Sequence, residues 1–197
     1  MNKKRFFMLL AGPLLMFAFA AQSAQAEGWR FPVGLTYVSN FSRVVDIYRD
    51  NIHWAGYTTT ADSYAPAGLS FNPYYQFESG FAVGGGIGPI MAISASPYEF
   101  VDFPVNLDVR YYIPASESIA PYARAGVRYH IASGDWVSNS SPGFIGGIGV
   151  EFLRNRRIGA GIELGYDTAT IELDKMRTHT TEKVRPGELM VSIFAVF

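Results

Sequence analysis

The sequence ends with "GELMVSIFAVF" at residues 187–197, and this stretch says most about the fold. Counted back from the end, every second residue is apolar: Phe197, Ala195, Ile193, Val191 and Leu189. Strict alternation of this kind predicts a β-strand with one apolar face. Ordering a chain terminus costs backbone entropy, so most chains in water end in a loose polar segment. The apolar final strand therefore predicts a terminus that is held in a sheet whose outer face contacts lipid.

Seven more segments show the same alternation. The clearest is "IGAGIELGYD" at residues 158–167, where Ile162 and Leu164 share one face and Glu163 lies on the other. The remaining six segments are residues 29–37, 67–77, 81–93, 103–113, 122–131 and 144–152. In 81–93 the pattern places Met91 and Ile93 on the same apolar face as Phe81. Eight strands is an even number, as in bacterial single-chain membrane barrels.

The connections between these segments alternate in length. Residues 78–80, 114–120 and 154–157 form short connections. The longer or more polar connections are residues 40–62, 94–102, 132–142 and 172–186. Short periplasmic turns opposite longer extracellular loops are typical of an outer-membrane barrel, with both termini on the periplasmic side. We therefore predict an all-β fold, an eight-stranded antiparallel up-and-down transmembrane β-barrel.

The face opposite the apolar one separates a membrane barrel from a soluble sandwich or lipocalin-type barrel. It combines charged residues with many glycines, such as Gly126, Gly149 and Gly161. Glycine on a face exposed to water would weaken a strand without any gain. Inside a narrow barrel, glycine makes room for the long Arg and Glu side chains opposite. This face therefore favours a polar lumen.

Aromatic residues favour the same alternative, because they gather near both ends of the apolar faces. Trp29, Tyr75 and Phe152 lie near the short connections, while Tyr37, Tyr129 and Tyr166 lie near the long ones. Two aromatic rings of this kind match the two interfaces of a membrane.

The N-terminal residues 1–26 predict a cleaved signal peptide. They combine a basic start, an apolar run shorter than a membrane span, and the small-residue sequence "AQA". Removing them leaves residues 27–197 as one barrel domain with 13 Lys and Arg against 17 Asp and Glu, a formal charge of −4. This balance argues against nucleic acid as a partner. The absence of cysteine excludes disulfides and thiolate sites, and no motif predicts a cofactor or a metal.

With eight strands, "PYARAGVRY" at 121–129 and "GFIGGIGVEF" at 143–152, the chain resembles the small outer-membrane β-barrel family that includes the OmpX, OmpA transmembrane-domain and Opa-like proteins. The resemblance covers nearly all of residues 27–197 and implies a location in the bacterial outer membrane. The final segment also resembles the insertion signal that the barrel-assembly machinery reads, which would involve Phe197, Ile193 and Val191. Further expected partners are outer-membrane lipid and lipopolysaccharide.

The candidate functional site is a cluster of charges on the lumen face of the predicted strands. It consists of Arg30, Asp108, Arg110, Arg124, Arg128, His130, Glu151, Glu163, Asp167 and Glu188. Because unpaired burial of a charge is costly, the near-balance of signs predicts mutual salt bridges. Arg124 and Arg128 lie on a strand next to that of Glu151, so the sequence predicts that they pair. We expect a plugged lumen rather than an ion path, since eight strands leave a bore only wide enough for side chains.

Three functions fit this barrel. The first is a surface scaffold or adhesin, or a protein of envelope integrity, whose extracellular ligand would bind loops 40–62 and 172–186. The second is a narrow channel for ions or small solutes, and the third is a lipid A-modifying enzyme. A deacylase of that kind needs a His and a Ser two residues apart on one strand, but Ala132 stands at that offset from His130. We therefore expect no catalytic residue and favour the scaffold.

Overall fold

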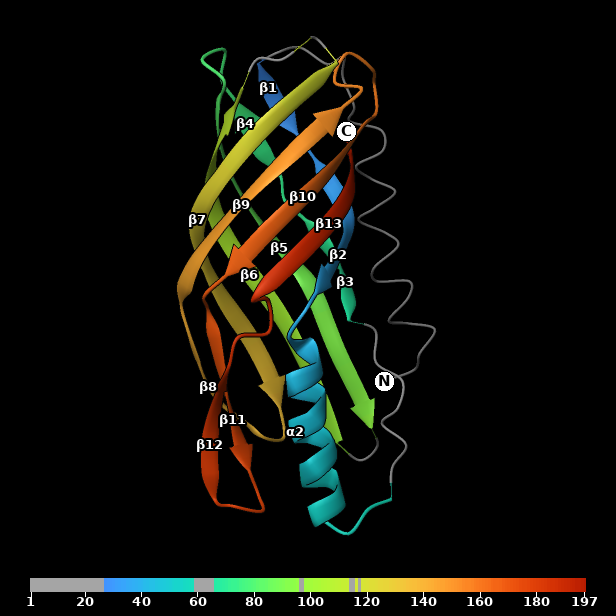
Figure 1. The fold of residues 1–197 in the computed structure, drawn as a ribbon, viewed down its shortest axis with the longest axis vertical. Helices are drawn as coiled ribbons and strands as arrows, with labels where there is room; N and C mark the ends of the chain where they lie inside the picture. The colour runs from blue at the N-terminus through green and yellow to red at the C-terminus, as the bar shows by residue number, and fades with distance from the viewer. Residues whose placement is uncertain (1–26, 59–65, 96–97, 114–115, 117) are drawn as a thin grey trace.

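The computed structural model describes residues 27–58, 66–95, 98–113, 116 and 118–197. The predicted signal peptide, residues 1–26, lies outside these ranges. The described chain forms a closed barrel of eight strands, each antiparallel to its neighbours (Figure 1). Two of these strands are interrupted, so we call each of the eight a stave, whether it consists of one segment or two. The first stave consists of β1 (Gly28–Arg30) and β2 (Pro32–Val38), and the second of β3 (Ala67–Phe71) and β4 (Tyr74–Gln76). The other six are β5 (Phe81–Ala95), β6 (Tyr98–Tyr112), β7 (Ile119–Gly134), β9 (Gly143–Phe152), β10 (Gly159–Asp167) and β13 (Leu189–Val196).

The last strand closes the barrel against the first, as the final stretch of sequence predicts. β13 pairs with β2 along its length. The amide of Phe31 donates to the carbonyl of Phe197 at 3.0 Å, and the amide of Phe197 donates back at 3.4 Å. No stave is left with an unpaired edge there, so the terminus is fixed by the sheet itself.

The alternation predicted from the sequence is confirmed on most strands. On β10, Ile162 and Leu164 are each 47% exposed while Glu163 is 6% exposed. The predicted aromatic rings also lie on the outside, with Trp29, Tyr37 and Tyr129 all more than 40% exposed. Apolar side chains therefore cover the outer wall and polar ones fill the inside.

The prediction for the second half of segment 81–93 is wrong. The β5–β6 register shifts by one residue between Ile87 and Met91, and Gly88 there has a φ of 110°. One extra residue turns every later side chain to the opposite face. Met91 and Ile93 are therefore buried inside, at 3% and 6% exposure, rather than facing lipid.

The four connections predicted as long loops differ from that prediction in conformation, because most of their described residues are in regular structure. Residues 40–62 contain helix α2 (Phe41–Trp54), and the described residues of 94–102 belong to the paired ends of β5 and β6. Residues 132–142 include β8 (Val137–Ser141), and residues 172–186 carry most of β11 (Thr170–Lys175) and β12 (Thr180–Val184). β8, β11 and β12 form a separate three-stranded sheet.

Helix α2 and this small sheet lie together at the end of the barrel opposite the C-terminus (Figure 1). With the projecting ends of β5, β6 and β7, they form a unit that we call the cap. The ring of Tyr48 on α2 packs 5.4 Å from Phe100 and 4.9 Å from Trp136, edge to face. The cap thus has its own apolar core. In the described ranges, no helix has the length and apolarity needed to cross a membrane.

Candidate functional site

The lumen charges form three connected groups along the barrel axis. The group nearest the short-turn rim centres on Glu151 of β9. Its Oε1 accepts hydrogen bonds from the phenols of Tyr74, at 2.6 Å, and Tyr112, at 2.7 Å. Arg154, from the β9–β10 turn, points inward, with its Nε 3.3 Å from Oε2 of Glu151 and its guanidinium 4.6 Å from the ring centre of Tyr112. Glu151 is thus paired with a turn arginine and hydrogen-bonded by two tyrosines.

The middle group joins β6, β7 and β10. Arg124 donates from Nη2 to Oδ2 of Asp108 at 2.8 Å and from Nη1 to Oε1 of Glu163 at 2.9 Å. Arg110 donates from Nε to Oδ1 of Asp108 at 3.0 Å. The phenol of Tyr122 donates to Oε2 of Glu163 at 2.7 Å. All these side chains are buried, so each charge depends on its partners rather than on bulk water.

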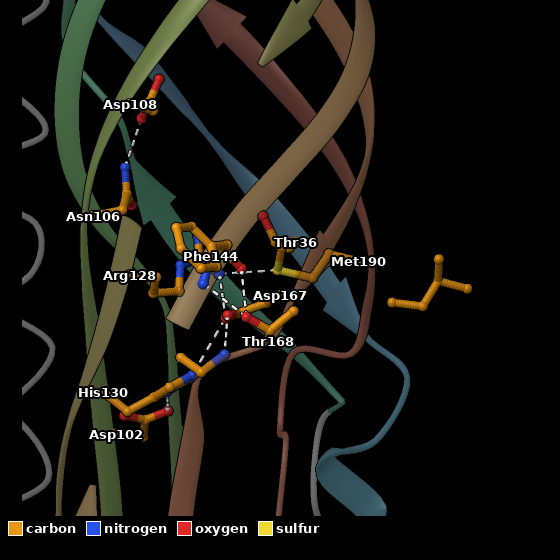
Figure 2. A network of polar contacts seen from close by, with 12 residues as sticks. Thr36, Asp102, Asn106, Asp108, Arg128, His130, Phe144, Asp167, Thr168 and Met190 are labelled. Atoms are coloured by element: carbon orange, nitrogen blue, oxygen red, sulfur yellow. Dashed lines mark hydrogen bonds and ion pairs between the residues drawn. The ribbon is translucent and has the colours of Figure 1, made fainter. Parts of the chain in front are cut away.

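The third group lies next to the cap and is shown in Figure 2. Asp167 lies between Arg128 and His130: its Oδ2 is 3.2 Å from Nη1 of Arg128 and 3.3 Å from Nε2 of His130. The other ring nitrogen of His130, Nδ1, lies 2.7 Å from Oδ2 of Asp102. Arg128 also lies 3.0 Å from the sulfur of Met190. These contacts form a chain of side chains that crosses the lumen from β6 to β10.

The structure places most of the predicted cluster on the inner face of the barrel, but the predicted pairing of Arg124 and Arg128 with Glu151 is wrong. Among the described residues, Arg124 and Arg128 form no ion pair with Glu151; they bind Asp108, Glu163 and Asp167 instead. The strand register explains this. Arg124 stands opposite Gly147, four residues from Glu151, a displacement of about 13 Å at roughly 3.3 Å per residue.

Of two further predicted members, Glu188 lies away from the lumen and Arg30 lies on its wall. Glu188 precedes β13 and is only half-buried, with Oε1 3.5 Å from the phenol of Tyr166, a residue of the outer face. It therefore does not belong to the lumen cluster. Arg30 is buried on the inner face of β1, where it stands opposite Tyr74 in the β1–β4 ladder.

Within the described ranges, the structure adds two charged lumen residues that the sequence analysis missed. Asp102 lies in a segment predicted as a loop, yet it continues the inward alternation of Asn106 and Asp108. Extending that alternation by two pairs of residues could have found it. Arg154 lies in a turn, where period-two alternation does not predict whether a side chain points into the lumen or outward.

Little space remains between these side chains. A cavity of about 20 Å³ lies among Thr36, Ser70, Arg124 and Glu163. This volume is enough for about one water molecule, which needs on the order of 10–15 Å³. The cap core closes the same end of the lumen at which the third group lies.

The contacts of His130 bear on the enzyme alternative. Its two ring nitrogens face the carboxylates of Asp102 and Asp167, while Ser133 is exposed on the outside of β7. Within the described ranges, no hydroxyl group is recorded in contact with this imidazole. The arrangement can hold the ring in place, but a His–Ser pair of the kind used for acyl transfer is not formed by these residues.

The outer wall carries the predicted assembly signal. Ile193 and Val191 are 58% and 38% exposed on β13, and Phe197 is half-buried at the short-turn rim. All three therefore lie at or near the seam where β13 meets β2.

Comparison with solved structures supports the same architecture. The outer membrane protein OprG from Pseudomonas aeruginosa aligns with a TM-score of 0.56 and 11% identity, over 87% of this chain and 95% of that one. Outer membrane protein W of E. coli aligns with a TM-score of 0.52 and 15% identity, over 88% and 98%. Outer membrane protein AlkL aligns with a TM-score of 0.50 and 12% identity, over 89% and 91%. These likenesses concern the fold alone. No curated protein matches the sequence significantly.

The sequence profile of the outer membrane protein beta-barrel domain matches residues 11–191, most of the chain. Together with the closed eight-stranded barrel, its apolar outer wall and its polar lumen, this match identifies the location as the bacterial outer membrane. The chain belongs to the family of outer membrane protein β-barrel domains.

Proposed function

We propose that this protein is a surface-presenting scaffold with a closed lumen, and that it is neither a channel nor an enzyme. The observation that supports the proposal is that the inside of the barrel is filled at two levels. Paired charges leave a cavity of only about 20 Å³ among them, and the apolar core of the cap lies beyond the third charge group. A hydrated ion would have to displace both, which favours a structural role for the lumen.

The cap supplies the surface that such a scaffold would present. α2 starts at the barrel mouth and runs away from it (Figure 1), so its last turn lies at the far end of the molecule. Trp54 and Tyr57 are 57% and 47% exposed there. Tyr57 packs edge to face on Tyr98, with ring centres 5.6 Å apart, and Tyr98 lies 4.5 Å from Trp136. Exposed Trp and Tyr held by a rigid base are typical of binding surfaces.

Whole-cell attachment tests the presenting surface. Cells displaying the wild type should attach to glycan-coated or hydrophobic surfaces more than cells with an empty vector, and Trp54→Ala/Tyr57→Ala should remove the gain. Arg49→Ala, an exposed residue of α2 outside the aromatic group, should keep it. Equal attachment of wild-type and empty-vector cells, at equal surface levels, would count against an adhesive role.

A narrow channel is the second candidate, and one observation favours it. In the described ranges, several buried lumen atoms have no hydrogen-bond partner in the protein, among them Nε of Arg124, Nε of Arg128 and Oδ1 of Asn106. Buried polar atoms of this kind usually bind water, so a thin hydrated path is an alternative to a dry plug. Swelling of liposomes in small sugars or salts would support the channel over the scaffold.

A further inference from the structure

An apolar groove crosses the outer face of the barrel near its short-turn rim. Its volume is about 440 Å³, within the range of roughly 300–1,000 Å³ seen for small-molecule sites. β7, β9 and β10, which form most of it, lie side by side on the near wall in Figure 1. The residues that define the groove are Ile113, Ala123, Ile148, Val150, Ile162 and Leu164.

The groove exists because a small residue stands between large ones. Ala123 of β7 pairs with Tyr111 of β6 on one side and with Ile148 of β9 on the other. Tyr111 is 45% exposed and Ile148 is 64% exposed, so both project from the wall beside a single methyl group. The result is a hollow on the lipid-facing side, which Pro121, Tyr122 and Gly149 also line.

A basic turn lies at the rim end of this groove. The β9–β10 connection is held by Leu153, whose φ is 58° and whose carbonyl accepts from the amide of Arg156 at 2.9 Å. Arg154 turns into the lumen, but Arg156 and Arg157 are exposed. Neither has an ion-pair partner among the residues that the structure describes. Two cations therefore face the solvent just beyond an apolar hollow.

The spacing matches one leaflet of a membrane. Arg157 precedes Ile162 by five residues, about 17 Å along the strand and about 13 Å along the membrane normal at a strand tilt of roughly 40°. One leaflet contributes about 15 Å of hydrocarbon, half of the roughly 30 Å core. A lipid whose headgroup lies at the basic turn would thus lay its acyl chain along the groove.

We propose that the groove and the basic turn form one binding site for an anionic glycerophospholipid of the periplasmic leaflet. The phosphate lies against Arg156 and Arg157, and one acyl chain lies over Ala123. The leaflet follows from topology, because the short turns and the C-terminus mark the periplasmic rim. The two arginines select an anionic headgroup, since each basic residue near an anionic lipid contributes about a fivefold gain in binding.

Native mass spectrometry of the full chain tests this proposal. The barrel is released from nanodiscs that contain equal amounts of phosphatidylglycerol and phosphatidylcholine with identical acyl chains. The wild type should retain one phosphatidylglycerol in preference to phosphatidylcholine. Arg156→Gln/Arg157→Gln should reduce that preference by about 25-fold, because two headgroup contacts worth about fivefold each are lost. Ala123→Leu should reduce retention of both lipids, because the added side chain fills the groove.

Matched controls separate this site from general lipid contact. Ala92→Leu enlarges an exposed residue of β5 outside the groove, and Arg49→Gln/Arg177→Gln removes two exposed cations of the cap. Both should retain lipid as the wild type does, and heat-modifiability should confirm that every variant folds. Equal retention of the two lipids by the wild type, or equal effects of the control and site variants, would overturn the proposal. So would a dimer that Ala123→Leu dissociates, since the groove would then bind a second copy.

Discussion

At the scale of single residues, the lumen depends on partners rather than on net charge. Arg124 bridges Asp108 and Glu163, with side-chain exposures of 4%, 0% and 7% for the three residues. Removing one partner leaves an uncompensated buried charge, which costs about 3–5 kcal/mol when burial is complete. Interior glycine contributes differently from the sequence prediction: a Cβ on Gly149 would lie 2.5 Å from the ring of Tyr122. At this position glycine makes room for an aromatic ring that holds Glu163.

Double-mutant cycles test these pairings. Arg124→Ala and Glu163→Ala should each lower the urea midpoint of unfolding in lipid vesicles, and the double variant should lose less than their sum. Arg128→Ala with Glu151→Ala serves as the control, since these two side chains bind different partners. Its losses should be additive. Additive losses for Arg124 and Glu163 as well would show that their contact contributes nothing measurable.

At the scale of elements, the cap is joined by contacts between α2 and the small sheet. Nε and Nη2 of Arg43 donate to the two carboxylate oxygens of Glu182 on β12, at 2.6 and 2.9 Å. The side-chain amide of Asn51 donates to the carbonyl of Asp174 at 2.7 Å, and its oxygen accepts from the amide of Met176 at 2.9 Å. Asn51 is 2% exposed, so these bonds fix the helix on β11.

Acid should loosen this attachment. Hydrogen bonds from Arg43 hold the pKa of the Glu182 carboxyl below its ordinary value, and Lys175 adds to this. Because the folded pKa is lowered, the stabilisation is complete above the unfolded pKa of about 4.3 and is lost as pH falls through the folded pKa. Hydrogen exchange of the α2 amides should therefore accelerate in that window in the wild type. Glu182→Gln should abolish the step, whereas Asp46→Asn, which removes only a pair within α2, should keep it.

The final strand carries a second prediction at this scale. If the assembly machinery reads Phe197, then Phe197→Ala should slow insertion and leave chain in the periplasm. Phe152→Ala, which removes another outward aromatic at the same rim, should insert at the wild-type rate. Fractionation after a pulse of synthesis measures both. Equal insertion of the two variants would mean that Phe197 acts only as one more interfacial aromatic.

These elements also show what sequence alone could predict. Period-two alternation located all eight staves, because one face contacts lipid and the other a polar lumen. It failed after Gly88, where one bulged residue exchanges the faces, and at the cap. Phe41, Val44, Val45 and Tyr48 have the spacing of a helix stripe, yet they lie in a segment that length and polarity marked as a loop. The ion pairs depend on register between strands, which single-strand patterns do not contain.

At the scale of the whole molecule, two sets of side chains with different chemistry fill the inside of the barrel. Charged groups occupy the membrane-spanning part, and apolar side chains occupy the cap above it. The fold therefore combines an apolar outer wall with a cap that has its own core. The central claim is that this lumen does not conduct.

Single-channel recording in planar bilayers tests that claim most directly. The purified wild-type protein, with insertion verified by protease protection, should show no steps above the bilayer background in molar potassium chloride. A conducting porin reconstituted in the same way provides the positive control. Stable, repeated conductance steps from the wild-type barrel would contradict the closed lumen and identify the protein as a channel.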